Sequence, residues 1–242
     1  MKKLFAFIFI LLSLKLFSFE RESFLEKLKK MVKEENLPFE VGLTEISKYK
    51  LEEVTGFKVP RDIDNSFRYK ALPIFIELPE RLDYREFGYV TPARNQKNCG
   101  SCWAFATVAP LESAILMYDN KSEDLSEQQL VSCNPWGWDC DGGSYAFDMY
   151  YDPGAALESC QPYTASDRTK CNNCSGVYKI VDWNYVSTSM PSVEEIKTAL
   201  FLFGPIAASM HASEAFMFYK SGVWTKDEGG EINHAIEIVG WD

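Results

Sequence analysis

Seven cysteines, all between positions 99 and 174, constrain this chain more than any other feature of its sequence. An odd number of cysteines cannot pair completely, so a chain that forms disulfides keeps at least one thiol, which becomes a candidate reactive group. Cys99 and Cys102 stand three positions apart in the segment CGSC. This spacing occurs in structural zinc sites, in thioredoxin-like redox pairs and in disulfides that lie beside a nucleophile. The rest of the sequence has to distinguish these uses.

The N-terminus predicts the compartment in which these thiols reside. Two lysines precede an uninterrupted apolar run at residues 4–12, and Lys15 soon follows it. The run is shorter than the roughly 20 residues that a spanning helix needs, and Ser18 offers a small residue for cleavage. We interpret residues 1–18 as a signal peptide and expect no stable membrane span, with an uncleaved anchor as the alternative. Export to an oxidising compartment lets cysteines pair, and we expect a secreted, periplasmic or lysosome/vacuole-like protein.

The composition predicts a globular protein and excludes nucleic acid as a partner. The chain has 242 residues, 46% of them hydrophobic, and a formal net charge of −10. Such an acidic field repels phosphate backbones. Residues 19–77 are too apolar for a free linker and contain a predicted amphipathic helix that ends near Asn36. We therefore expect this segment to dock on the rest of the chain, with a mobile linker as the alternative.

The hydrophobic patterns predict helices first and strands later. Helices are expected over residues 101–118, where Pro110 should produce a kink, over a short stretch that starts at Ser126, and over residues 192–203. Strands are expected over residues 177–186 and 232–241. A helical half followed by a strand-rich half is typical of an α+β protein with two packed lobes.

Cys102 is the strongest candidate for a chemical role. Its position at the start of a predicted helix should favour the thiolate and lower the pKa of the thiol. A thiolate nucleophile needs a proton acceptor nearby, and the chain has only two histidines. His234 precedes a strand-like apolar run that would hold its ring rigidly, whereas His211 precedes a predicted loop. We therefore favour His234 over His211.

The segment around Cys102 also resembles the nucleophile segment of the papain family of cysteine proteases. The resemblance starts with QKNCGSCWAF at residues 96–105, and His234 lies within the interval of about 130 to 150 residues that the family shows after its cysteine. Further matching motifs follow the family order over residues 78–242: LPERLDYR at 78–85, LSEQQLVSC at 125–133, CDGG at 140–143, GPI at 204–206 and NHA at 233–235.

The resemblance implies a particular fold and domain organisation. The fold would be a papain-like α+β fold with a helical left lobe and an antiparallel β-barrel-like right lobe. Residues 78–242 would form the peptidase domain, and residues 19–77 resemble a short inhibitory propeptide of the cathepsin B-like kind. The family also has an asparagine beyond the histidine that orients the imidazole, followed by the closing strands. The sequence ends at Asp242 without them, so we expect the peptidase domain to be incomplete at its C-terminus.

The resemblance also implies the role of each site residue. Cys102 would attack the peptide carbonyl as half of a thiolate–imidazolium pair with His234 and form a thioester. The Gln96 side chain and the backbone N–H of Cys102 would form the oxyanion hole. The positions that would bind the substrate backbone or line an open apolar pocket are Gly142, Gly143, Ser144, Tyr145, Ser209, Ile232 and Asn233.

The cysteine pairing implied by the resemblance uses six of the seven cysteines. Cys99 would pair with Cys140, and Cys133 would pair with either Cys171 or Cys174, leaving the other for Cys160. Cys102 would stay free. An oxidising compartment argues against a zinc site made of Cys99, Cys102, Cys171 and Cys174, and no βαβ unit precedes the CGSC segment as a thioredoxin-like protein would require. We therefore expect no metal and no cofactor.

These inferences combine into one functional hypothesis. The chain is expected to be the secreted, monomeric precursor, or zymogen, of a papain-like thiol protease. Its partners would be peptide or protein substrates and its own propeptide, which would act as an intramolecular inhibitor. The alternative is a truncated, non-catalytic relative that serves as a binding or decoy module.

Overall fold

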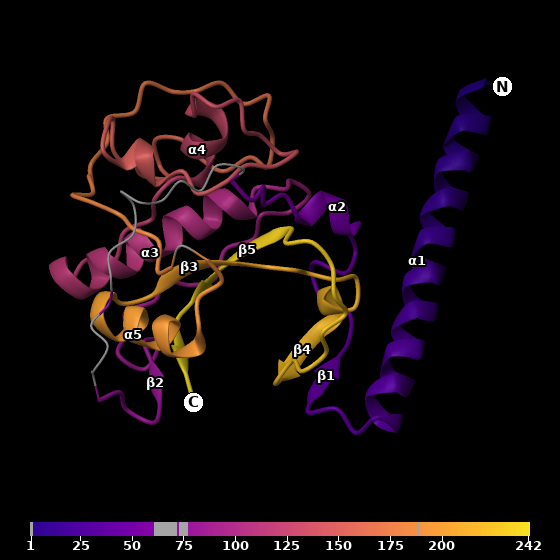
Figure 1. The fold of residues 1–242 in the computed structure, drawn as a ribbon. Coiled ribbons are helices and arrows are strands. Elements are labelled where there is room, and N and C mark those ends of the chain that lie inside the picture. The colour runs from indigo at the N-terminus through magenta and orange to yellow at the C-terminus, as the bar shows by residue number, and fades with distance from the viewer. Residues whose placement is uncertain (1, 61–71, 73–76, 188) are drawn as a thin grey trace. The chain divides into compact units, whose positions relative to one another are not determined.

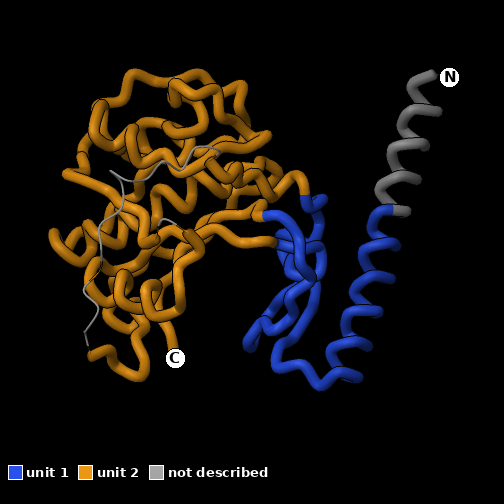
Figure 2. The backbone as a smooth tube through the Cα atoms, in the orientation of Figure 1, with its two compact units in different colours: residues 1–51, 212–231 blue, residues 52–211, 232–242 orange. Residues whose placement is uncertain are grey.

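The computed structural model describes residues 2–60, 72, 77–187 and 189–242 (Figure 1). These residues form two compact units, residues 1–51 with 212–231 and residues 52–211 with 232–242 (Figure 2). Each unit contains residues from both sides of the predicted boundary between residues 77 and 78. That boundary lies beside residues 61–71 and 73–76, which are outside the described residues, and it stays a prediction.

The first unit consists of a long helix and a two-stranded antiparallel sheet. The predicted amphipathic helix is present but extends further toward the N-terminus than expected, and it ends close to Asn36, which has a positive φ of 49°. Strands β1 and β4 pair with an irregularity between Glu40 and Val41. The elements of the unit are α1 (Lys2–Glu34), β1 (Phe39–Val41), the 3₁₀ turn η2 (Phe216–Phe218) and β4 (Tyr219–Gly222).

The second unit contains the remaining elements. Strands β3 and β5 pair antiparallel, from Ile206 opposite Ile238 to Met210 opposite His234, and β2 pairs antiparallel with β6. The described residues therefore form three two-stranded sheets in all, without the closed barrel that the resemblance implied. The elements are α2 (Leu51–Val54, from Glu52 onward in this unit), β2 (Leu82–Asp83), α3 (Cys102–Asp119), α4 (Glu127–Cys133), η1 (Phe147–Tyr150), α5 (Val193–Phe203), β3 (Ile206–Met210), β5 (His234–Ile238) and β6 (Gly240–Trp241).

The helix starts agree with local sequence signals. The Ser126 hydroxyl accepts a hydrogen bond from the Gln129 backbone at the start of α4, and Ser192 forms a reciprocal capping box with Glu195 at the start of α5. The Gln129 side chain does not complete a box, because it donates to the Gly154 carbonyl instead. Helix α3 runs continuously through Pro110.

The predicted strand over residues 177–186 is wrong. Within this described stretch, Tyr178 forms an isolated bridge with Ala155 and no regular strand follows. Val181 is 97% exposed, so its β-branched side chain has no sheet or core to pack against. The strand prediction for residues 232–241 is confirmed by β5 and β6.

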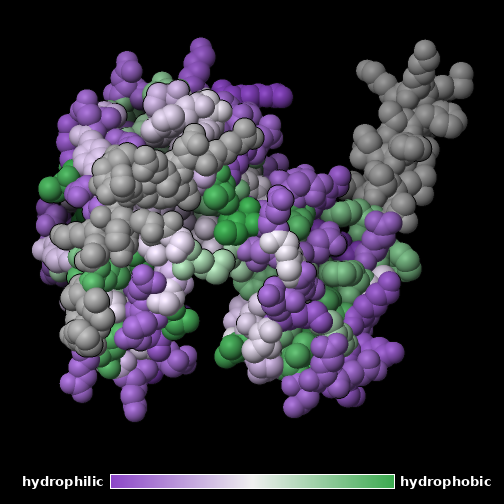
Figure 3. Space-filling model, in the orientation of Figure 1, coloured by the Kyte–Doolittle hydropathy of each residue, from purple (hydrophilic) through white to green (hydrophobic). Residues whose placement is uncertain are grey.

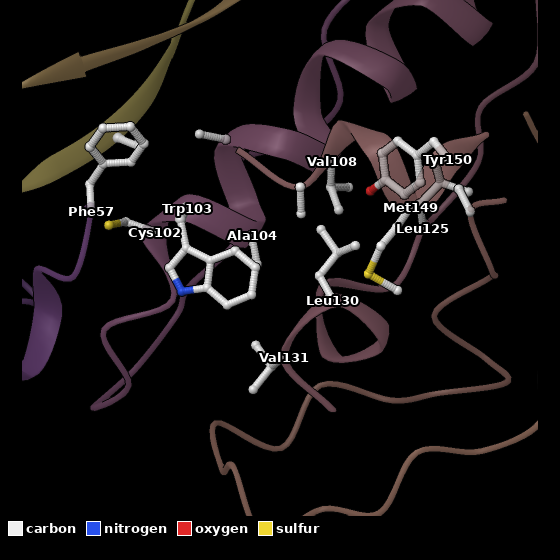
Figure 4. Close-up of a cluster of buried hydrophobic side chains, with 14 of the residues drawn as sticks. Phe57, Cys102, Trp103, Ala104, Val108, Leu125, Leu130, Val131, Met149 and Tyr150 are labelled. Carbon is white, nitrogen blue, oxygen red and sulfur yellow. The ribbon is translucent and has the colours of Figure 1, made fainter. Parts of the chain in front are cut away.

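The core of the second unit surrounds α3. Trp103, Leu125, Leu130 and Tyr150 are completely buried there. Figure 4 shows Phe57 and Cys102 close together at one end of this cluster. Hydrophilic residues cover most of the described surface in the view of Figure 3. Among the described residues, no helix is both long and apolar enough to cross a membrane.

Candidate active site

Cys102 is the first residue of α3 and is 1% exposed. Burial raises the pKa of its thiol, because a thiolate loses hydration inside the protein. Backbone hydrogen bonds from Ala235, Gly56, Trp103 and Phe57 oppose this effect and lower the pKa, but burial is the largest influence. The sulfur is thus surrounded by N–H groups from three parts of the chain, one of them the residue directly after His234.

The other six cysteines form three disulfides. Cys99 joins Cys140, as the resemblance implied. The open alternative is resolved in favour of Cys133 with Cys171 and Cys160 with Cys174. Cys102 is the free cysteine. Because Cys99, Cys171 and Cys174 have their sulfurs in disulfides, the CGSC segment is neither a redox pair nor half of a four-sulfur zinc site in this structure.

His234 is the first residue of β5, whose pairing with β3 fixes its backbone. Its Nδ1 atom is buried and has no hydrogen-bond partner among the described residues. Burial lowers the pKa of His234 to about 4, so the imidazole is neutral near pH 7. Ala235, the residue directly after His234, forms a backbone hydrogen bond to the Cys102 sulfur. His211 lies just after the end of β3.

The expectation of a lowered thiol pKa is wrong for this state of the protein. Backbone N–H groups favour the thiolate, among them that of Trp103 in α3, but the cost of burying a charge is larger. The same cost keeps His234 neutral. Phe57 packs in the cluster that contains Cys102, so residues from before position 60 help to create the environment that opposes the ion pair.

Gln96 has both protons of its side-chain amide engaged. Its Nε2 atom donates to the Cys99 carbonyl at 2.8 Å and to the Val54 carbonyl at 3.1 Å. The first bond fixes the side chain against the segment that leads to Cys102. The second connects it to the end of α2, so a carbonyl of the chain itself binds the group that was predicted to bind a substrate oxyanion.

Residues 56–58 also bind at the positions predicted to hold a substrate backbone. The Gly143 N–H donates to the Gly56 carbonyl at 2.9 Å, and the Lys58 N–H donates to the Gly143 carbonyl at 2.7 Å. The N–H groups of Gly56 and Phe57 both donate to the Asn233 carbonyl at 2.9 Å. Phe57 and Gly143 form a bridge of parallel direction. Residues 56–58 thus form backbone hydrogen bonds with Gly143 and Asn233, two of the predicted substrate-binding positions.

Two glycines allow this close approach. A Cβ atom at Gly56 would lie 2.0 Å from the Gly100 carbonyl oxygen, and one at Gly143 would lie 2.8 Å from the Trp103 ring. Gly142 has a φ of +119°, a conformation that glycine adopts readily. Sequence analysis predicted Gly142 and Gly143 but missed Val54, Gly56 and Phe57. The one available signal for this segment was Gly56 followed by the aromatic Phe57 in a charged stretch.

The predicted pocket residues Tyr145 and Ser209 are brought together. The Ser209 side chain lies near enough to lower the pKa of Tyr145, but burial is the larger influence and raises this pKa well above its ordinary value. The Phe57 ring packs against Tyr145 with 4.8 Å between the ring centroids. Ser144 is buried, whereas Ile232 is 38% exposed. The predicted open apolar pocket at these positions stays a prediction.

A cavity of about 620 Å³ lies between α3 and β5 and was not predicted. Glu112, Glu127 and Glu237 line it together with apolar side chains. Burial raises the pKa of Glu127 to about 8 and that of Glu237 to about 7. Repulsion from Glu112 adds to the rise at both residues. These carboxyl groups are therefore costly to ionise in the folded protein.

The family described as papain family cysteine protease matches residues 78–242. The chain therefore belongs to the papain family of cysteine proteases.

Relatives match with different extents. Falcipain-2b of Plasmodium falciparum (isolate 3D7) is 40% identical over 164 residues, which cover 66% of this chain and 33% of the relative. Cysteine proteinase 2 of Zea mays is 38% identical, over 69% of this chain and 48% of the relative. A cathepsin L-like proteinase of Fasciola hepatica is 32% identical, over 91% of this chain and 73% of the relative. The chain thus spans between a third and a half of the length of the first two relatives.

Solved structures show the same fold. The digestive procathepsin L2 proteinase from Tenebrio molitor larval midgut matches with a TM-score of 0.82 and 24% identity, over 93% of this chain and 76% of that chain. The proform of the ragweed pollen allergen Amb a 11 matches with a TM-score of 0.72 and 29% identity, over 91% of this chain and 73% of that chain. The predicted papain-like α+β fold is confirmed. These two matches, which cover more than nine tenths of the chain, are a procathepsin L2 and another proform, and the cathepsin B-like type of the propeptide stays a prediction.

Proposed function

We propose that this chain is the latent form of a papain-like cysteine protease, in which residues 54–58 block the catalytic groups. The observation that carries the proposal is the shared pairing of Gln96, Gly143 and Asn233 with this segment. All three were predicted from the sequence to bind substrate. A peptide substrate needs the same backbone donors and acceptors, so the segment and a substrate exclude one another.

Removal of the segment would also change the electrostatics. Loss of Phe57 and its neighbours would admit water and reduce the burial that raises the pKa of Cys102 and lowers that of His234. The proton of the thiol could then pass to the imidazole. The segment thus inhibits in two ways: it occupies the site, and it keeps the two catalytic groups neutral.

The chemistry of the released site follows from the residue types. The Cys102 sulfur attacks the peptide carbonyl carbon, and the carbonyl oxygen takes the negative charge, which the Gln96 amide and the Cys102 backbone N–H stabilise. His234 gives its proton to the leaving amine as the C–N bond breaks and a thioester forms. His234 then takes a proton from water as the water attacks the thioester. The acid leaves as the C–S bond breaks, which releases Cys102 as a thiolate while the proton from water stays on His234.

The cellular role remains part of the proposal. We propose that residues 1–18 direct export and that residues 19–77 act as the propeptide. The protein would then work as a monomer in a secreted, periplasmic or lysosome/vacuole-like compartment, on peptide or protein substrates. The three disulfides support an oxidising compartment.

Thiol labelling tests the proposal. The full chain, with its disulfides formed, is treated with a peptidyl epoxide before and after limited proteolysis that removes residues up to about 77, and Cys102→Ala serves as the control. We expect labelling of Cys102 after proteolysis, little before it, and none in the control. Turnover of a fluorogenic peptide should follow the labelling. A trimmed chain that neither labels nor cleaves peptides would contradict the proposal and favour a non-catalytic binding module.

A further inference from the structure

We infer that Tyr163 is a positioning residue for the oxyanion hole, and this inference rests on the proposed protease function. Its hydroxyl donates to the Gln96 backbone carbonyl at 2.8 Å and lies 2.7 Å from the Ser101 Oγ atom. Sequence analysis assigned Tyr163 no role. In the chain it lies more than 60 residues from both of its partners.

The direction of these hydrogen bonds follows from counting protons. A tyrosine hydroxyl has one proton, and Tyr163 uses it on the Gln96 carbonyl. The Ser101 hydroxyl is therefore the donor of the 2.7 Å bond to the Tyr163 oxygen, which is shorter than the 3.4 Å from the same hydroxyl to the Cys99 carbonyl. The result is a short relay of hydrogen bonds from Ser101 through Tyr163 to Gln96.

The two ends of this relay carry the two donors of the oxyanion hole. One donor is the Gln96 side-chain amide, and the other is the backbone N–H of Cys102, directly after Ser101. An oxyanion hole works only when its donors are held in place before the charge forms. Tyr163 connects the two backbone positions from which the donors extend, while the Cys99 carbonyl holds the far end of the Gln96 side chain at 2.8 Å.

Tyr163 is itself held firmly. Its ring packs edge-on against Phe105 of α3, with 5.0 Å between the centroids. Its backbone N–H donates to the Glu158 carboxylate at 2.6 Å, and the Cys160–Cys174 disulfide begins three residues before it. Burial raises the pKa of Tyr163 well above its ordinary value, so the hydroxyl keeps the proton that it donates to Gln96.

The test compares matched tyrosine variants of the proteolytically activated chain. In Tyr163→Phe we expect kcat for a fluorogenic peptide to fall about tenfold with KM within twofold, because one neutral hydrogen bond is lost and the substrate contacts remain. Alkylation of Cys102 by iodoacetamide should stay within twofold, because this reaction forms no oxyanion. The control is Tyr178→Phe, which also removes a hydroxyl hydrogen bond, the partly buried one to Glu123 at 2.8 Å, and should leave kcat within twofold.

A double-mutant cycle separates positioning from general stability. In a Gln96→Ala background, Tyr163→Phe should cause no further loss of kcat, because the group that it positions is gone. Ser101→Ala interrupts the relay at its other end and should lower kcat about threefold if Tyr163→Phe proves too unstable to assay. An unchanged kcat in Tyr163→Phe, an equal loss in both backgrounds, or a parallel loss of alkylation would each overturn the inference. Absence of epoxide labelling in the activated wild type would instead overturn the proposed function and this inference with it.

Discussion

Two buried regions of the second unit contrast sharply, although α3 and β5 contribute to both. The catalytic region around Cys102 and His234 is filled by residues 54–58, and Gln96, Gly143 and Asn233 all have partners there. The cavity lined by Glu112, Glu127 and Glu237 is open and holds three carboxyl groups close together. Burial disfavours charge in both regions. Burial of His234 makes the first region less stable in acid, and burial of the carboxyl groups makes the second region less stable in base.

The carboxyl cavity should produce the largest effect of pH. The pKa of Glu127 rises from about 4.5 to about 8 on folding, so the unfolded chain ionises first and stability is lost as pH rises from 4.5 to 8. Glu127→Gln should therefore raise the free energy of unfolding at pH 8 by up to about 4 kcal/mol and change it little at pH 4.5. Urea denaturation at both pH values measures this. The exposed Glu194→Gln is the control, and an equal effect of Glu127→Gln at both pH values would contradict the assignment.

The oxyanion donor should produce the next largest effect, confined to catalysis. Gln96→Ala removes one of two donors and should lower kcat of the activated enzyme by about 100- to 1000-fold, from about 2.7–4 kcal/mol of lost transition-state stabilisation. Iodoacetamide should still alkylate Cys102 at a rate close to that of the wild type. A fall in alkylation of similar size would show that Gln96 supports the shape of the site and not the oxyanion.

Acid should loosen the catalytic region. The pKa of His234 falls from about 6.5 to about 4 on folding, so protonation favours any state in which the ring reaches water. The form in which residues 54–58 fill the site is fully stable, with respect to His234, above pH 6.5. As pH falls toward 4, this form loses up to about 3 kcal/mol of stability. Epoxide labelling of the intact chain should therefore speed up between pH 6.5 and 4. Labelling that is independent of pH in this range would exclude the burial of His234 as the cause of latency.

Steric fit at Gly56 should produce the smallest of these effects. A side chain there meets the Gly100 carbonyl, and such overpacking costs about 1–3 kcal/mol. Gly56→Val should then increase epoxide labelling of the intact chain by about tenfold or more. The exposed Glu52→Ala, in α2 just before this segment, is the matched control. If both variants label as slowly as the wild type, residues 54–58 are not the block.

The sequence by itself determined what depends on neighbouring residues. The caps at Ser126 and Ser192 require partners only three positions away, and the nucleophile at the start of α3 lies in one uninterrupted motif. Cys102 and His234 were predicted from their local sequence and Gln96 through the family resemblance, and the catalytic roles of all three stay predictions. The odd cysteine also followed from a count alone.

Only the tertiary structure decided what depends on residues far apart in the chain. The choice between Cys171 and Cys174, the contact of Val54 with Gln96 and the bridge of Tyr163 between Gln96 and Ser101 all need positions in space. The pKa of Cys102 shows the physical reason most clearly. The position of Cys102 at a helix start could be predicted from the sequence, but burial depends on everything packed around the sulfur, and in the folded chain burial is the largest influence on this pKa.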